Sequence, residues 1–128
     1  ATLGAWDVHS ADLDNDGYPD LIVPRYYGGS SYSTDSYVFW GSASGYSDAD
    51  RTDIPTVGAT RISVGDLDGD GVPELVANNY YTGGWTSFAD TWIYWGDAAS
   101  PYYDSADRTA LSTYGSFPAV RLVGNTDW

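Results

Sequence analysis

Short hydrophobic and aromatic stretches recur along the chain, and runs rich in Gly, Ser or Asp separate them. Leu21-Ile-Val23 and Tyr37-Val-Phe-Trp40 are typical of strands, because β-branched and aromatic residues favour strands while Gly and Asp favour turns. Gly pairs at 28–29 and 83–84 mark turns within each half. The pattern predicts strands at about 4–11, 21–23, 37–40, 46–54, 57–65, 73–79, 91–95 and 101–111.

The second half of the chain repeats the first. Segment 12–21, Asp-Leu-Asp-Asn-Asp-Gly-Tyr-Pro-Asp-Leu, returns 54 positions later as Asp-Leu-Asp-Gly-Asp-Gly-Val-Pro-Glu-Leu. Segment 35–41 returns 55 positions later, and segment 49–52 returns 57 positions later. Because several matches follow one another in the same order, the chain is an internal duplication whose second copy has slightly longer loops.

Each repeat contains four predicted strands in about 50–60 residues, which is the size of one blade of a β-propeller. We expect an all-β fold of two four-stranded antiparallel propeller-type blades, with an extra C-terminal strand near 117–124. The expected organisation is a first repeat at 1–56, a second at 57–114 and the start of a third at 115–128.

The Asp-rich loop of each repeat carries the candidate chemistry. Its acidic side chains stand at positions 1, 3, 5 and 9, so that alternate side chains of a tight turn converge on one centre. The carbonyl of the residue after the Gly, Tyr18 or Val72, can supply a further oxygen. Such a cluster repels itself unless a cation sits within it, and many hard oxygen ligands without His or Cys favour Ca²⁺.

Two other kinds of loop share parts of this acidic pattern. An EF-hand needs a bidentate Glu at position 12 between two helices, but that position is Val23 in one loop and Ala77 in the other, both in strand-like runs. A solvated acidic turn without metal is the plainer alternative. The presence of an acid at every one of these positions in both loops argues against it.

The two repeats resemble the FG-GAP/VCBS repeats of integrin-α-type, calcium-binding β-propellers. The resemblance rests on the Asp-rich loops and on segments 39–46 and 94–96, and it covers nearly the whole chain. It implies a calcium loop between the first two strands of each blade and two Ca²⁺ ions per chain. The implied ligands are Asp12, Asp14, Asp16, the Tyr18 carbonyl and Asp20 in the first loop, and Asp66, Asp68, Asp70, the Val72 carbonyl and Glu74 in the second.

Composition narrows the possible partners. With 18 acidic and 5 basic residues the net charge is −13, which excludes the basic footprint that nucleic-acid binding needs. No apolar run approaches the ~18 residues of a membrane span. The chain has no Cys and no Lys, and His9, its one His, lacks a Ser–Asp context. We therefore expect no catalytic residues and no enzyme activity.

The chain contains no methionine and begins at Ala1. Removal of a signal peptide before Ala1 would explain this, and so would excision from a longer protein. We expect an extracellular protein, either secreted or at the cell surface.

Aromatic residues make up 16% of the chain and fall into two groups. Packing between blades is the expected role of Phe39, Trp40, Tyr94 and Trp95, which lie in apolar strands. A second group lies beside Gly- and Ser-rich loops. Its members have three possible roles, which are local packing, stacking on sugar rings and contact with a protein partner. This group consists of Tyr26, Tyr27, Tyr80, Tyr81 and Trp85.

Two blades are too few to close a propeller, which usually has four to eight. Unpaired edges and apolar faces would be left in water, so we expect either a homo-oligomer or a part of a longer propeller. The expected function is that of a binding or adhesion module with a glycan or protein ligand. Alternatives are a structural subunit of a self-assembling ring or filament without a small ligand, and an accessory domain of a secreted enzyme.

Overall fold

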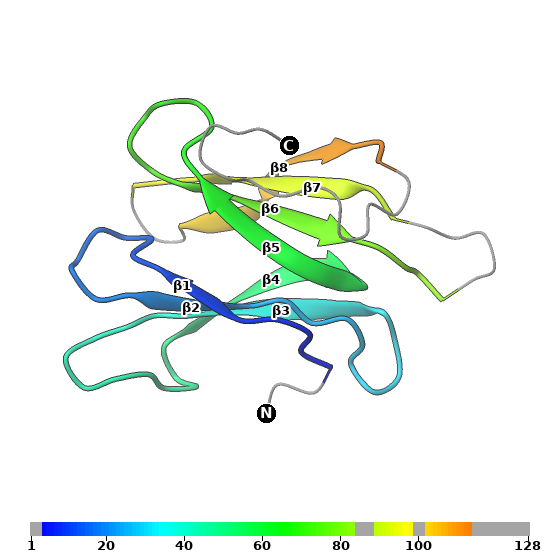
Figure 1. The fold of residues 1–128 in the computed structure, drawn as a ribbon, viewed down its shortest axis with the longest axis horizontal. Coiled ribbons are helices and arrows are strands. Elements are labelled where there is room, and N and C mark those ends of the chain that lie inside the picture. The colour runs from blue at the N-terminus through cyan, green and yellow to red at the C-terminus, as the bar shows by residue number, and fades with distance from the viewer. Residues whose placement is uncertain (1–3, 84–88, 99–101, 114–128) are drawn as a thin grey trace.

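The computed structural model describes residues 4–83, 89–98 and 102–113 of the chain. They form two four-stranded antiparallel sheets that lie one above the other (Figure 1). The predicted all-β fold of two four-stranded blades is confirmed. The expected extra strand near 117–124 lies outside the described residues. The described part of the chain contains no helix of the length and hydropathy that a membrane span requires.

In the first sheet the strands follow one another in chain order. They are β1 (His9–Ala11), β2 (Asp20–Val23), β3 (Ser33–Phe39) and β4 (Arg51–Val57). β3 begins earlier than the sequence predicts, because residues 33–36 pair with the end of β4. β4 begins later than predicted, because residues 47–50 form a separate turn in which the Asp50 N–H donates to the Ser47 carbonyl at 3.1 Å.

The second sheet repeats this order. Its strands are β5 (Ala59–Gly65), β6 (Glu74–Asn79), β7 (Thr91–Gly96) and β8 (Tyr103–Leu111). A single residue, Gly58, leads from the last strand of the first sheet into the first strand of the second. Its φ of 55° and its approach to the Tyr81 backbone, where a Cβ would lie 2.3 Å from the carbonyl oxygen, both require glycine.

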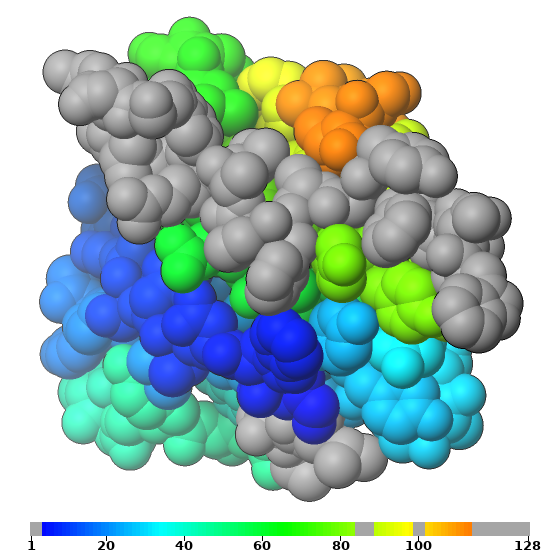
Figure 2. Space-filling model, turned by 45° about the vertical axis from the view of Figure 1, so that its right-hand side comes forward, coloured from blue at the N-terminus to red at the C-terminus, as the bar shows by residue number. Residues whose placement is uncertain are grey.

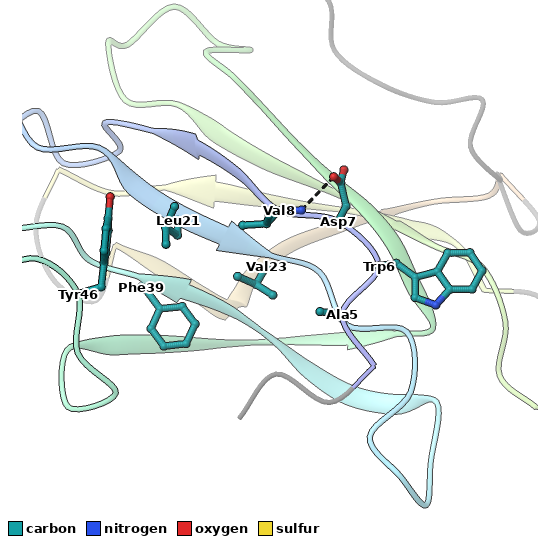
Figure 3. Close-up of a pocket in the computed structure, with 8 residues that line it drawn as sticks. All are labelled: Ala5, Trp6, Asp7, Val8, Leu21, Val23, Phe39 and Tyr46. Carbon is teal, nitrogen blue, oxygen red and sulfur yellow. Dashed lines mark hydrogen bonds between the residues drawn. The ribbon is translucent and has the colours of Figure 1, made fainter.

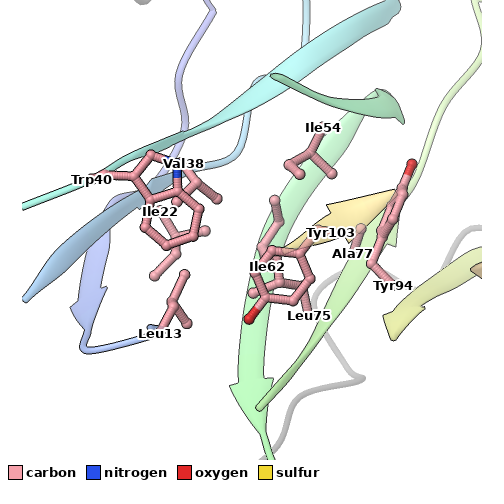
Figure 4. Packing of buried hydrophobic residues seen from close by; sticks show 10 residues of the cluster. All are labelled: Leu13, Ile22, Val38, Trp40, Ile54, Ile62, Leu75, Ala77, Tyr94 and Tyr103. Atoms are coloured by element: carbon pink, nitrogen blue, oxygen red, sulfur yellow. The ribbon is translucent and has the colours of Figure 1, made fainter. Parts of the chain in front are cut away.

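The hydrophobic core lies between the two sheets (Figure 4). Successive residues of a strand point to opposite faces, so Ile22 and its partner Val38 face the second sheet while Leu21 and Phe39 face away from it. The predicted core role is confirmed for Trp40 and Tyr94. Phe39 and Trp95, by contrast, are half-buried. The core cluster consists of Leu13, Ile22, Val38, Trp40 and Ile54 from the first repeat, and Ile62, Leu75, Ala77, Tyr94 and Tyr103 from the second.

Candidate metal centres

The two Asp-rich segments are the β1–β2 loop, residues 12–19, and the β5–β6 loop, residues 66–73. In Figure 1 both project from the same side of the molecule, one in blue and one in green. The β2–β3 connection and the residues that directly follow β6 leave the sheets on the opposite side. The topology therefore gathers the acidic loops of both repeats at one end of the blades.

Each loop is folded by its first carboxylate. The Asp12 oxygens accept hydrogen bonds from the backbone N–H groups of Asp16 at 3.1 Å and Gly17 at 2.9 Å. Asp66 holds its loop in the same way, through the N–H groups of Gly69 and Gly71, both at 2.9 Å. These side-chain turns draw the chain around the carboxylate, and the acids at positions 3 and 5 extend the pattern.

The sixth position of the loop needs glycine in both repeats. Gly17 has a φ of 90° and Gly71 a φ of 89°, in the left-handed region that strains any residue with a Cβ. The nearly equal values show that the two loops share one backbone conformation at this point. The sequence pattern therefore reports a real geometric requirement of the loop.

The ninth-position acid anchors the loop to the sheet. Asp20 is fully buried, and its two oxygens accept hydrogen bonds from Leu13 N–H at 2.7 Å and Gly41 N–H at 2.8 Å. The buried Glu74 does the same with Leu67 N–H at 2.7 Å and Gly96 N–H at 3.3 Å. Each acid thus ties its own loop to the end of the third strand, a role that sequence reasoning did not foresee.

The structure brings three carboxylates together in each loop. Asp12, Asp14 and Asp20 each have one oxygen within 4.8 Å of the others. In the second loop the corresponding group is Asp66, Asp68 and Asp70. Carboxylate oxygens at such short separations, with no His or Cys among the ligands, suit a hard cation such as Ca²⁺.

The titration of these groups reflects their crowding. Desolvation, followed by the charges of Asp20 and Asp16, raises the pKa of Asp14 to about 6. Desolvation also raises the pKa values of Asp20 and Glu74, although the hydrogen bonds that these carboxylates accept from backbone N–H groups lower them. Negative charge is therefore unfavourable at Asp14 unless a proton or a cation is near.

The remaining predicted ligands have mixed positions. Asp16 lies outside the group of three in its loop but is close enough to raise the pKa of Asp14. Glu74 lies outside the group in the second loop, where Asp70 takes part instead. The roles of the Tyr18 and Val72 carbonyls as ligands stay predictions.

Comparison with known protein families resolves what these repeats are. The FG-GAP repeat model matches residues 4–39 and 58–90, which together make up more than half of the chain. The chain belongs to the FG-GAP repeat family. Comparisons with curated proteins and with solved structures gave no match.

Each of the two matched segments falls on one of the two sheets. Each FG-GAP segment begins before the first strand of a sheet and includes the Asp-rich loop and the second strand. The protein is accordingly a β-propeller-type repeat module. FG-GAP repeats are generally non-catalytic and typically extracellular.

At the opposite end from the acidic loops, aromatic rings from both repeats form one cluster. Trp6 stacks on Tyr26 with 4.5 Å between ring centroids, and Tyr32 lies 4.8 Å from Tyr27 and 5.0 Å from Tyr81. Figure 2 shows the light-blue β2–β3 connection and the yellow-green residues after β6 on the same side of the molecule. We call Trp6, Tyr26, Tyr27, Tyr32, Tyr80 and Tyr81 the aromatic cluster.

The aromatic cluster was only partly predictable. The Tyr pairs after the second strand of each repeat were candidates for ligand contact, whereas Trp85 lies outside the described residues. Tyr32, which contacts both repeats, was missed because no repeat signal marks it. His9 was also missed: its Nε2 donates a hydrogen bond to the Ile62 carbonyl and so links the two sheets.

Proposed function

We propose that this FG-GAP protein is a calcium-binding, extracellular module for binding or adhesion. The observation that carries the proposal is the pair of carboxylate groups, each of three acids, at the same end of two duplicated blades. Each loop presents only oxygen ligands, and each backbone is already folded around the carboxylates. A Ca²⁺ ion at each site would relieve the repulsion among the acids and connect the loop to the sheet.

Residues of the first site would be Asp12, Asp14 and Asp20, with Asp16 and the Tyr18 carbonyl completing the set. The second site would use Asp66, Asp68 and Asp70, completed by the Val72 carbonyl and Glu74. Extracellular calcium modules work at about 10⁻⁴–10⁻³ M, which matches the calcium level outside cells. Two bound ions would change the formal charge from −13 to −9.

Isothermal titration calorimetry tests the metal. We expect two Ca²⁺ per chain and little binding of Mg²⁺ at the same concentration, because Mg²⁺ demands fewer ligands and gives up its water reluctantly. The double variant Asp14→Ala with Asp68→Ala is expected to bind none. Wild-type protein that releases no heat with calcium and melts at the same temperature with and without a chelator would refute the calcium proposal.

The aromatic cluster supports a ligand surface at the other end of the blades. Trp6 is 55% exposed and Tyr27 is 37% exposed, so parts of these rings are open to solvent. Flat rings of this kind stack on the apolar faces of sugars, and a neutral glycan avoids repulsion from an acidic chain. We therefore expect retention on neutral polysaccharide columns that Tyr27→Ala weakens. Tyr18→Ala, which removes an exposed ring at the opposite end of the blades and keeps the backbone carbonyl, is expected to leave the retention unchanged.

A further inference from the structure

The duplication gives each repeat two apolar faces. The face of the first repeat that packs on the second is here called the front face, and the face of the second repeat that receives it is the rear face. The front face of the first repeat consists of Leu13, Ile22, Val38, Trp40 and Ile54. The rear face of the second repeat consists of Ala59, Ile62, Leu75, Ala77, Tyr94 and Tyr103.

The first repeat has its own rear face at the corresponding positions. These are Ala5, Val8, Leu21, Val23, Phe39 and Tyr46. All six of them, with Trp6 and Asp7, line an apolar hollow of about 710 Å³ on the side of the first sheet away from the second (Figure 3). The hollow is therefore the first repeat's version of the surface that, in the second repeat, is filled by a neighbouring blade.

Local geometry shows that the two rear faces are built alike. Tyr46 donates its hydroxyl to the Pro19 carbonyl at 2.8 Å, and Tyr103 donates to the Pro73 carbonyl at the same distance. Beside them, the Arg51 guanidinium lies 4.0 Å from the Tyr37 ring centroid, and Arg108 lies 3.8 Å from that of Trp92. The rear face of the first repeat thus has the same local geometry as that of the second, although no blade packs on it.

What differs is exposure. Val8 is 56% exposed, whereas its counterpart Ile62 is fully buried. Tyr46 is 46% exposed, whereas Tyr103 is 3% exposed. An apolar surface that the protein buries in one repeat and leaves in water in the other is unfavourable for an isolated chain.

The second repeat has the complementary surface. Its front-face positions are Leu67, Val76, Ile93, Trp95 and Leu111. Val76 is already buried within one chain, and Ile93 and Trp95 are half-buried. Leu67 and Leu111 are 43% and 42% exposed, whereas their counterparts Leu13 and Ile54 are 3% and 1% exposed. The Trp side chains are held alike, since Trp40 donates to Thr52 and Trp95 to Thr109, each at 2.9 Å.

Size and charge both match across a junction between two copies. Most substitutions between the repeats, such as Ile22 to Val76 or Tyr94 to Phe39, keep an apolar side chain of similar volume; at one position the larger Val23 stands where the second repeat has Ala77. Asp7 and Arg61 are counterparts of one another, and they pair at 3.8 Å within the chain. In a junction between two copies, Arg61 of one would meet Asp7 of the other, so the opposite charges face each other again.

We propose that a second copy of this chain docks head to tail, with the front face of its second repeat in the hollow of the first repeat. The junction continues the interface that already joins the two repeats, with the same residue types at the same positions. Because the two faces differ, the contact is heterologous, and repetition closes a ring or extends a filament. The inference concerns self-association and does not depend on the ligand proposed above.

Two single substitutions test the proposal in the full 128-residue chain. Val8→Asp places a charge in the hollow, and Leu111→Asp places one on the opposite front face. Both side chains are exposed within one chain, so each variant is expected to keep the wild-type circular dichroism spectrum and melting temperature at low concentration. Ser30→Asp, in the exposed β2–β3 connection, is the matched control for added negative charge.

Size-exclusion chromatography with light scattering, in calcium at about 100 μM protein, gives the readout. Wild type and Ser30→Asp are expected at a multiple of the monomer mass, and each face variant at the monomer mass, since an unpaired charge is costly in an apolar junction. An equimolar mixture of the two face variants is expected to give a dimer, twice the monomer mass, through its one intact junction. A monomeric wild type, an oligomer that neither variant disrupts, or a mixture that stays monomeric would each overturn the proposal.

Discussion

Leu13 and Leu67 occupy the same position in the two acidic loops, and each backbone N–H donates to the ninth-position acid at 2.7 Å. Yet Leu13 is 3% exposed and Leu67 is 43% exposed. Leu13 lies against the second repeat, whereas Leu67 points to a face that no further blade covers in the described part of the chain. The burial of this leucine is therefore a property of the junction between repeats and not of the loop itself.

The two candidate metal sites differ for the same reason. Leu13, Asp14 and Asn15 of the first loop line a cavity of about 270 Å³ together with Asp70, Gly71 and Val72 of the second loop and with Tyr102. Asp14 is half-buried, whereas its counterpart Asp68 is exposed; the ninth-position acids of the two loops are equally buried. The neighbouring repeat thus lowers the solvation of one carboxylate of the first site, and so strengthens the electrostatic interactions there.

The largest expected difference lies in the two leucines. Leu13→Ala is expected to lower the free energy of unfolding by about 2–5 kcal/mol, as for a fully packed core leucine. Leu67→Ala is expected to change it by less than about 0.5 kcal/mol at concentrations where the chain is monomeric. Urea denaturation of the two variants measures this, and equal losses would mean that Leu67 is buried within a single chain.

Calcium removal comes next in size. With dissociation constants of about 10⁻⁴–10⁻³ M, 10 mM Ca²⁺ stabilises the folded chain by about 1.4–2.7 kcal/mol per site. We expect thermal unfolding to show this increase and a chelator to abolish it. Stabilisation that 10 mM Mg²⁺ reproduces in full would point to charge screening and not to calcium ligation.

Asp14→Ala and Asp68→Ala compare the calcium affinities of the two loops. We expect the first site to bind calcium more tightly, by roughly tenfold or about 1.4 kcal/mol, because its acids are less solvated. In calorimetry Asp14→Ala should remove the tighter step and Asp68→Ala the weaker one. The reverse assignment would show that coverage by the neighbouring repeat weakens the site.

His9→Ala gives the smallest expected effect. The variant loses one hydrogen bond between the sheets, to the Ile62 carbonyl, which is worth about 0.5–1.5 kcal/mol. Calcium affinity should be unchanged, because the imidazole contacts the second sheet and not a loop. A drop in calcium affinity equal to that of Asp14→Ala would contradict the metal sites as described.

Much of the molecule follows from local sequence. The duplication, the order of strands and the two acidic loops were all predictable, because turns such as the one that Asp12 closes on Gly17 form within a few residues. The glycine at the sixth position of each loop indicates the positive φ that the backbone adopts there. Local rules of this kind act equally in both repeats, so they predict two identical sites.

Only the tertiary structure decided how the repeats differ. Leu13 is buried while Leu67 is exposed, and Tyr32 gathers rings from both repeats, through contacts that no segment encodes alone. The physical reason is that apolar burial depends on which surface lies opposite. A duplicated sequence specifies both faces of every blade, but the packing of blades determines which of them leave water.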